Sequence, residues 1–407
     1  MVYILNKNGE PLMPTKRYGK IRRLLDAKQA KVIRRCPFTV QLLYDTSNIT
    51  QPIVLGVDAG SKVAGLSAAT SKEELYAAEC SLRTDIVNNL SERRQYRRAR
   101  RNRKTRYRKP RFNNRRRTGG WLAPSIQRKI DTHLRLISDI QNLLPITSII
   151  VEVASFDIQK IKDPSISGAK YQQGEQLGFW NVREFVLFRD GHKCMCCKGK
   201  SGDIILSVHH IESRRIGGDA PNNLITFCET CHNGLHKKKI ESSVKRGTSY
   251  RDAAFMGVMR WALYEKLKKL YPSVTLTYGY ITKNTRITNG LEKTHAVDAR
   301  CITGNPQAAP SGNRYLQRAV RGKNRQIHKA TIYKGGRRRA AQAQKILFGF
   351  RLNDKVKLPA GIVGFIGGRR LSGIFLIRAI DGSKVTEITY KKLDLLEMRR
   401  TILTVTI

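Results

Sequence analysis

The chain has 407 residues, 40% of them hydrophobic, so it is long enough to fold into several domains with buried cores. Its 77 Lys and Arg against 31 Asp and Glu give a formal net charge of +46. A folded chain with so much mutual repulsion requires a polyanion that neutralises much of this charge, so a protein without such a partner is excluded. On charge alone, a ribosomal or chromatin-like binder fits better than an enzyme that works inside a nucleic-acid complex. No apolar run reaches the roughly 20 residues that span a bilayer, and the N-terminus has no signal pattern, so we expect an intracellular protein.

Residues 1–50 predict a small αβ module with many Lys and Arg. The expected elements are a turn at 6–9, a basic helix between 17 and 30, and strands at 2–5, 30–34 and 38–44. This composition indicates contact with nucleic acid and no specific chemistry.

Residues 53–65 (IVLGVDAGSKVAG) predict a buried strand that runs into a carboxylate, Asp58, and then into glycines. An Asp before a Gly is more often only a turn residue. Here, two further strands are expected at 63–69 and 75–80. Three consecutive strands, the first of which ends in an acidic residue, are typical of the beginning of an RNase H-like sheet. A carboxylate in that position is well placed to hold a divalent metal.

Two more acidic positions add to this signal. Glu152 lies inside a strand-like run at 149–153, and His295 and Asp298 are three residues apart and so lie on one face of a helix. A lone His-x-x-Asp would usually be a surface pair. Three separated acidic positions, each on or next to a regular element, predict a two-metal site for phosphodiester hydrolysis.

Residues 91–117 form the most basic stretch, and Ser91 followed by Glu92 predicts the start of a helix. A helix that is basic all round has no apolar stripe to bury, and its like charges repel. It is therefore either a disordered arm or a helix ordered by threading between phosphate backbones, and we favour threading because the stretch interrupts the predicted catalytic core. The expected contacts are Arg93, Arg97, Arg100, Lys104 and Arg108 on one face and Arg94, Arg98 and Arg101 on another. The amphipathic helix expected at 121–144 is ordinary core.

Residues 181–250 predict a self-contained insert with a helix at 182–188 and a strand at 204–209. Its strongest signal is two C-x-x-C pairs at structural-zinc spacing, which in a reducing compartment indicate metal before disulfides. Cys196 falls outside the pattern. The expected zinc ligands are Cys194, Cys197, Cys228 and Cys231. Histidines within the insert can deprotonate a water or hold a metal on a phosphate.

Beyond the insert, an apolar helix and a strand at 274–280 lead to Lys283 and Arg286, which either contact phosphates or lie in a solvated loop. The helix opened by His295 follows. Residues 311–345 are rich in Arg and Lys, and residues 356–407 predict short strands and turns, as in a small β-barrel-like module that lies on nucleic acid.

The order of these pieces resembles the IscB family, compact transposon-encoded RNA-guided nucleases related to the ancestors of the CRISPR single-effector nucleases, over nearly the whole length. The PLMP motif at 11–14 and PFTVQL at 37–42 are similar to the family's N-terminal domain, and the arginine stretch is similar to its bridge helix. Four residues fall on the split RuvC nuclease motifs: Asp58, Glu152, His295 and Asp298. The first motif reads D-A-G, and the chain has no large recognition lobe, which argues against a CRISPR effector proper.

The insert resembles an HNH nuclease of the zinc-bound ββα-metal type. By this resemblance, His210 matches the general base, His209 and His232 the metal side, and Asn223 the asparagine that orients the loop. His236 is a candidate further ligand.

The resemblance implies an α/β multidomain protein with an RNase H-like RuvC core split into three segments, and an active enzyme because the expected side chains are all present. The implied boundaries are an N-terminal domain at 1–50, RuvC segments at 51–90, 121–180 and 251–310, a bridge helix at 91–120, an HNH domain at 181–250, and a basic linker with a β-rich domain reading a target-adjacent motif at 311–407. The implied cofactors are two Mg²⁺ at RuvC, held by Asp58, Glu152 and Asp298, one Mg²⁺ at HNH, and a structural Zn²⁺. The implied partners are a noncoding guide RNA and double-stranded DNA, bound by a monomeric protein in a prokaryotic cytoplasm and associated with the nucleoid when acting.

Two other functions stay open. One is a protein-only HNH homing or restriction-like endonuclease, although such enzymes rarely need a second nuclease core around an arginine helix. The other is an RNA-guided binder that blocks transcription without cleavage, and the intact carboxylates count against it.

Overall fold

The structure of the chain is a computed structural model that describes residues 1–101, 121–153, 182–212, 221–237, 251–310, 312–322, 344–359 and 361–407, with the backbone alone for 96–101, 221 and 251–255. The chain divides into two compact units, which are described separately. The core unit comprises residues 1–116, 123–155 and 256–407, and the insert unit comprises residues 117–122 and 156–255. In the described part of the chain, no helix is both long and apolar enough to cross a membrane.

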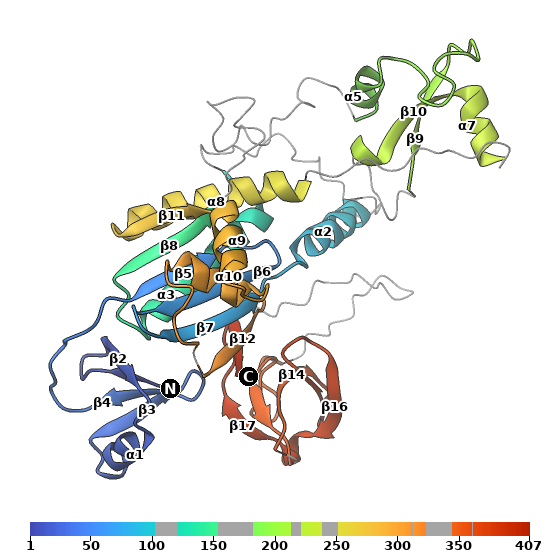
Figure 1. The fold of residues 1–407 in the computed structure, drawn as a ribbon. Coiled ribbons are helices and arrows are strands. Elements are labelled where there is room, and N and C mark those ends of the chain that lie inside the picture. Colours follow the sequence, from blue (N-terminus) through green and yellow to red (C-terminus); the bar gives the residue numbers. More distant parts are fainter. Residues whose placement is uncertain are drawn as a thin grey trace. The chain divides into compact units, whose positions relative to one another are not determined.

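The core unit begins with a four-stranded sheet in the order β2-β1-β4-β3 (Figure 1). Its elements are β1 (Val2–Leu5), β2 (Pro11–Thr15), α1 (Tyr18–Asp26), β3 (Ala30–Arg34) and β4 (Thr39–Leu42). Ile21 on α1 and Val40 on β4 lie in its apolar core. The Tyr3 hydroxyl donates a hydrogen bond to the carbonyl of Leu75 at 3.0 Å, which joins this module to the next sheet.

The centre of the core unit is a seven-stranded sheet in the order β11-β8-β5-β6-β7-β12-β18 (Figure 1). Its strands are β5 (Val54–Asp58), β6 (Val63–Ala69), β7 (Glu74–Ser81), β8 (Ser148–Val153), β11 (Val274–Tyr278), β12 (Arg314–Ala319) and β18 (Ile402–Thr406). Strands β5, β6 and β7 pair antiparallel, β8 is parallel to β5, and β11 is parallel to β8. The strand expected within 53–65 and the strands expected at 63–69, 75–80 and 149–153 are all in this sheet.

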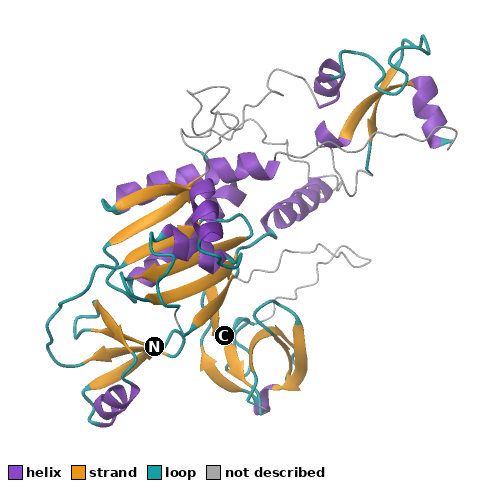
Figure 2. Ribbon diagram, in the orientation of Figure 1, coloured by secondary structure: helices purple, strands orange, loops and turns teal. Residues whose placement is uncertain are grey.

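Helices cover the two faces of this sheet (Figures 1 and 2). Helices α8 (Arg251–Leu270), α9 (Gly279–Thr288) and α10 (His295–Ile302) follow the insert, and α2 (Ile86–Arg101) and α3 (Pro124–Gln141) precede it. Helix α3 buries a stripe that includes Ile130, Ile137 and Ile140, because apolar residues recur along it every three or four positions. This is the core helix expected at 121–144.

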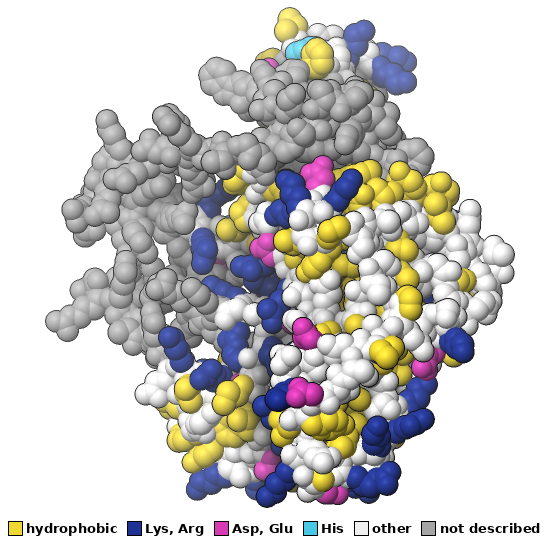
Figure 3. Space-filling model, turned by 90° about the vertical axis from the view of Figure 1, so that its left-hand side faces the viewer, with side chains coloured by type: hydrophobic (Ala, Val, Ile, Leu, Met, Phe, Trp, Pro, Cys, Tyr) yellow, Lys and Arg dark blue, Asp and Glu magenta, His cyan; other side chains and the backbone are white. Residues whose placement is uncertain are grey.

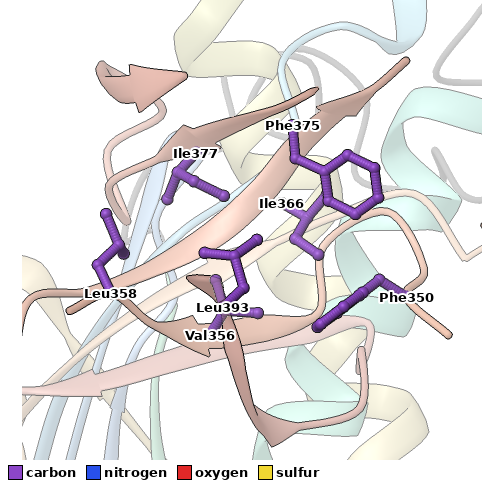
Figure 4. Packing of buried hydrophobic residues seen from close by; sticks show 7 residues of the cluster. All are labelled: Phe350, Val356, Leu358, Ile366, Phe375, Ile377 and Leu393. Atoms are coloured by element: carbon purple, nitrogen blue, oxygen red, sulfur yellow. The ribbon is translucent and has the colours of Figure 1, made fainter. Parts of the chain in front are cut away.

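The C-terminal module is a curved five-stranded sheet in the order β16-β15-β14-β13-β17. Its strands are β13 (Lys355–Lys357), β14 (Val363–Arg369), β15 (Ile374–Arg378), β16 (Lys384–Thr389) and β17 (Asp394–Glu397), with a 3₁₀ turn, η3 (Tyr390–Lys392). Alternate strand residues such as Ile366 and Phe375 point inward and pack with Phe350 into an apolar core (Figure 4).

The insert unit contains a two-stranded antiparallel ribbon between helices. Its described elements are α5 (Val182–Arg189), β9 (Leu206–His210), η2 (Pro221–Asn223), β10 (Leu224–Cys228) and α7 (Glu229–His236). Phe227 on β10 lies in its small apolar core beside the cysteines. The small core indicates that other bonds contribute to its stability.

Three expectations about elements are wrong. Ser91 lies inside α2, which begins at Ile86, because Asp85 already accepts the backbone N–H of Asn89 and the first helical turn forms there. The strand expected at 274–280 ends at Tyr278. Of the two alternatives for Lys283 and Arg286, the solvated loop is excluded, because both residues lie on helix α9. The last strand, β18, pairs with β12 in the central sheet and not with the C-terminal module.

Candidate functional site

The carboxylates of Asp58 and Glu152 lie on neighbouring parallel strands. Asp58 is the last residue of β5, and the register that sets Val57 opposite Val151 brings Glu152 of β8 alongside it on the same face. Both residues are buried, with 5% and 7% of their surfaces exposed. Two charged groups at this depth require compensating positive charge.

Helix α10 brings His295 and Asp298 to the same end of the sheet, and two glycines allow it to approach. A Cβ added at Gly56 or at Gly65 would overlap a carbonyl oxygen of the α10 backbone. Only glycine fits at such a contact between backbones. The acidic site, defined as Asp58, Glu152, His295 and Asp298, is therefore assembled by strand register and by close helix packing.

Burial, a hydrogen bond and neighbouring charges shift the pKa values of three residues of the acidic site. The His295 Nδ1 atom lies 2.6 Å from Asp58 Oδ2, and this hydrogen bond raises the pKa of His295 against the opposing effect of burial. Burial raises the pKa of Asp298, and the charge of Asp58 raises it further. Burial also raises the pKa of Glu152, while the guanidinium of Arg260 lowers it. A cation at this site would relieve the mutual repulsion of the carboxylates.

Arg260 on α8 is a site residue that the sequence analysis missed. Its Nη2 atom lies 2.8 Å from Glu152 Oε1 and 3.6 Å from Asp58 Oδ1, and its Nε donates to the Ala59 carbonyl at 2.8 Å. The only available sequence signal is an arginine inside the apolar stretch 253–264 of this helix, beside Met259, which is fully buried. A buried arginine needs a partner, but the sequence does not name it.

Arg286 and Lys283 were predicted to contact nucleic acid. Arg286 Nε lies 3.0 Å from Asp298 Oδ1 with only 13% of its side chain exposed, so it is part of the acidic site's charge balance. Lys283 is exposed on the same helix.

The acidic site suits a divalent cation by its chemistry. Carboxylate oxygens are the ligands that Mg²⁺ prefers. Burial is the main cause of the raised pKa values of Glu152 and Asp298, and the charge of Asp58 adds to it. Among the described residues, the potential ligand atoms of the acidic site do not all lie within 4.8 Å of one another. The groups of three or more side chains that meet this distance are in the insert unit. A cation binding here would compete with Arg260 for the carboxylates.

The four predicted zinc cysteines come together in the insert unit. Cys194, Cys197, Cys228 and Cys231 offer Sγ atoms that all lie within 4.8 Å of one another. The Ser201 hydroxyl lowers the pKa of Cys197 to about 6, whereas burial raises the pKa of Cys228 and Cys231. A closed set of four sulfurs is the ligand set of a structural zinc, which would hold these thiols as thiolates. The exposed Cys196 is outside the group.

Three histidines form a second group in the insert unit. His209 on β9 and His232 and His236 on α7 place their ring nitrogens within 4.8 Å of one another, and His232 Nε2 lies 3.3 Å from His236 Nε2. Burial lowers the pKa of His209 and of His232, and the neighbouring rings lower these values further. Neutral imidazoles with converging nitrogens suit a metal ion. His236 thus joins the two histidines assigned to the metal side.

His210 and Asn223 lie around the end of the ribbon. Because strand residues alternate, His210 lies on the ribbon face opposite to that of His209. The Asn223 side chain is fully buried; it accepts a hydrogen bond from the Glu212 amide at 2.9 Å and donates one to the Glu212 carbonyl at 3.0 Å. It therefore fixes the chain where it leaves β9 just after His210.

The arginine stretch is described only in part. Arg93 and Arg94 are exposed on α2. Arg97, Arg98, Arg100 and Arg101 lie on the same helix, whose side chains are not described from residue 96 on, and Lys104 and Arg108 lie outside the described residues. Elsewhere on the surface, Figure 3 shows Lys and Arg side chains spread over one face with scattered acidic side chains.

Two family models match separate parts of the sequence. Residues 2–174 match the RRXRR protein family, and the run 97–101 reads RRARR. Residues 194–238, which hold both the cysteine and the histidine groups, match the HNH endonuclease family. The insert unit thus contains an HNH endonuclease domain, the kind of domain that hydrolyses phosphodiester bonds. This domain carries the four-cysteine cluster.

Solved structures give distant matches. A Streptococcus thermophilus Cas9 in complex with the AGAA PAM is 15% identical with a TM-score of 0.33, over 52% of this chain and 30% of that one. The Type II-C Cas9 enzyme from Actinomyces naeslundii is 12% identical with a TM-score of 0.25, over 62% of this chain and 59% of that one. The chain thus spans less than two thirds of either Cas9. No curated protein matches the sequence.

Proposed function

We propose that the protein is an RNA-guided DNA endonuclease of the IscB kind, in which a guide RNA pairs with target DNA and two nuclease sites each cut one strand. The observation that carries the proposal is the presence, in one chain with an HNH domain, of a second site built by Asp58, Glu152, His295 and Asp298. The order of the central strands, three antiparallel followed by two parallel, supports an RNase H-like RuvC core for that second site.

At the acidic site, Asp58, Glu152 and Asp298 would hold two Mg²⁺, with His295 as a ligand or base. Bound magnesium supplies charge to the phosphate and lowers the pKa of a bound water. The protein's own contribution is to align the carboxylates through the β5–β8 register and the packing of α10, and to hold a proton on His295 next to Asp58. This site would cut the displaced strand.

At the HNH site, His209 and His232, joined by His236, would hold one Mg²⁺ on the scissile phosphate. His210 is the proposed general base that takes a proton from the attacking water, and Asn223 holds the loop beside it in place. This site would cut the strand paired to the guide.

The RNA and DNA partners are inferred from charge and from the domain order. A net charge of +46 matches a protein permanently bound to a structured RNA, and the sequence of the target would then be read by base pairing and not by the protein. The domain boundaries at 50, 90, 120, 180, 250 and 310 and the target-adjacent-motif role of the C-terminal module belong to the same proposal.

The test begins with expression of the protein together with its native flanking DNA, followed by purification and sequencing of the RNA that comes with it. A single structured RNA with a variable end is expected. The complex is then given duplex targets with each strand labelled: Asp58→Ala should cut only the guide-paired strand and His210→Ala only the displaced strand. His192→Asn, at an exposed position of the same insert unit, is the control and should cut both.

Two other outcomes would contradict this proposal. Random cellular RNA, with the pure protein cutting DNA at one fixed sequence, would favour a protein-only HNH homing or restriction-like enzyme. Loss of both cuts in either single variant would show that the two-site assignment is wrong.

A further inference from the structure

The turn at residues 59–62 connects β5 to β6 and follows Asp58, the last residue of β5. This turn is tight. The Gly60 amide donates a hydrogen bond to the Asp58 carbonyl at 3.1 Å, and a Cβ added at Gly60 would overlap the Val63 carbonyl oxygen. Because the turn begins at the backbone of Asp58 itself, a shift of the turn would also shift the Asp58 carboxylate.

Two cationic side chains from two helices hold this turn by its backbone carbonyls. Arg260 of α8 donates from Nε to the Ala59 carbonyl at 2.8 Å. Lys129 of α3 donates from Nζ to the Ser61 carbonyl. Hydrogen bonds from charged donors are roughly twice as strong as those between neutral groups, so both contacts restrain the turn effectively.

The face of α3 that carries Lys129 is packed close to the acidic site. His133 lies four residues further along and so on the same face, with 1% of its surface exposed, and its Nδ1 lies 2.8 Å from the Lys129 carbonyl. Burial lowers the pKa of His133, and the charge of Asp58 opposes this effect, so this face lies within electrostatic range of Asp58. The half-buried Lys129 side chain therefore extends from a fixed turn of the helix.

The contacts of Arg260 and Lys129 differ in one respect. Arg260 also contacts the carboxylates of Glu152 and Asp58, for which a metal ion would compete with it. The Lys129 contact is made to a backbone carbonyl three residues after Asp58. It can therefore remain in place when the carboxylates take a different partner.

We propose that Lys129 is a positioning residue for the acidic site, which holds the turn at 59–62 so that Asp58 keeps its metal-binding orientation. The inference rests on the proposed function, because it takes the acidic site to be a metal-dependent nuclease site. Side chains that orient a metal ligand from outside the coordination shell typically contribute about 10- to 100-fold to metal affinity or activity. We expect Lys129 to contribute at the lower end of this range, because Arg260 holds the same turn.

The test uses the full chain with its copurified RNA and compares Lys129→Met and Lys129→Arg with the wild type. Methionine keeps much of the length of the side chain without the charge or the donor, whereas arginine keeps both. Lys266→Met is the matched control, because Lys266 is also half-buried and joins α8 to α3, but it donates to Gln127 Oε1 at 3.2 Å and not to the turn.

Three quantities are measured. The first is Mn²⁺ affinity by calorimetry, taken from the binding step that Asp58→Ala removes. The second is the rate of hydrogen exchange at the Gly60 amide. The third is the rate of cutting of each labelled strand of a duplex target, in which the guide-paired strand is the internal control for folding and RNA loading.

Lys129→Met should weaken this Mn²⁺ binding about 10-fold, speed exchange at Gly60 and slow the cut of the displaced strand alone. Lys129→Arg should recover most of the Mn²⁺ affinity, and Lys266→Met should resemble the wild type. A purely structural role would lower stability without changing the Mn²⁺ affinity.

Two results for Lys129→Met would overturn the proposal and leave the proposed function intact. One is wild-type Mn²⁺ affinity and Gly60 exchange. The other is an equal loss of both cuts, which would mean that Lys129 supports the fold as a whole. If the wild type shows neither Asp58-dependent Mn²⁺ binding nor a cut of the displaced strand, the proposed function of the acidic site itself fails.

Discussion

Replacing Arg260 with glutamine tests whether a protein cation and a metal ion compete for the same carboxylates. Arg260 contacts Glu152 and Asp58 at once, and its side chain is only 16% exposed. Glutamine keeps much of the length of the side chain but removes its charge. The variant therefore leaves two buried carboxylates short of one positive charge.

The expected cost follows from burial. Removing one partner of a buried ion pair typically costs about 3–5 kcal/mol. Asp58 retains its hydrogen bond to His295, so we expect the lower end, about 3 kcal/mol, in the absence of metal. A bound divalent cation would replace the missing charge, and if it recovers about 2 kcal/mol, metal affinity should rise about 30-fold.

The assay is urea unfolding of the full chain in EDTA and in Mg²⁺, with Mn²⁺ binding followed by calorimetry. The control is Arg314→Gln, which removes a cation from an exposed pair with Glu292 in the same unit. That change should cost less than about 1 kcal/mol and should not depend on metal.

Two results would refute this reasoning. Equal destabilisation of Arg260→Gln in EDTA and in Mg²⁺ would mean that no cation replaces the guanidinium. Weaker metal binding in the variant would mean that Arg260 supports the metal site and does not compete with it.

Three further predictions follow from the structure. Cys228→Ser should abolish stoichiometric zinc and unfold the insert unit, whereas Cys196→Ser should keep the zinc, as measured by metal analysis and limited proteolysis. Gly65→Ala should push α10 off the sheet, costing about 1–3 kcal/mol in urea unfolding and abolishing the cut assigned to the acidic site, whereas Gly19→Ala, with open space around its Cβ position, should do neither. Burial lowers the pKa of His133 from 6.5 to about 4, so the unfolded chain takes up this proton first and stability should fall by up to about 3 kcal/mol as pH drops from 6.5 towards 4. His133→Gln should flatten that part of the pH profile of urea unfolding, and an unchanged profile would contradict the assignment.

Short stretches of sequence were enough to predict the strands that carry the acidic residues and the cysteine pairs. The strand ending in Asp58 and the strand around Glu152 are short apolar runs with one acid each, and such runs are recognisable without their partners. The C-x-x-C pairs are equally local, because a zinc site imposes its spacing on the chain.

Long-range partners could not be predicted in this way. Arg260 contacts carboxylates on two strands that precede the insert, and nothing near Arg260 in the sequence identifies them. Strand β12 shows the same limit: its Arg- and Lys-rich surroundings hide an alternation in which Tyr315 and Gln317 are buried. Gln317 is buried in the strand because its Nε2 donates to the Tyr76 hydroxyl at 3.1 Å, a partner on β7.

The contact between Glu152 and Arg260 also explains how the core unit can accommodate the insert unit. The longer part of the insert unit occupies residues 156–255, and these two residues lie just before and just after it in the sequence. Their 2.8 Å ion pair closes the core unit across the two ends of the insert. Because the entropic cost of closing a loop grows only slowly with the length of the loop, a long insertion at this point destabilises the central sheet only slightly. The acidic site can therefore be completed by residues that follow the insert, His295 and Asp298, while the HNH domain stays covalently tethered to it.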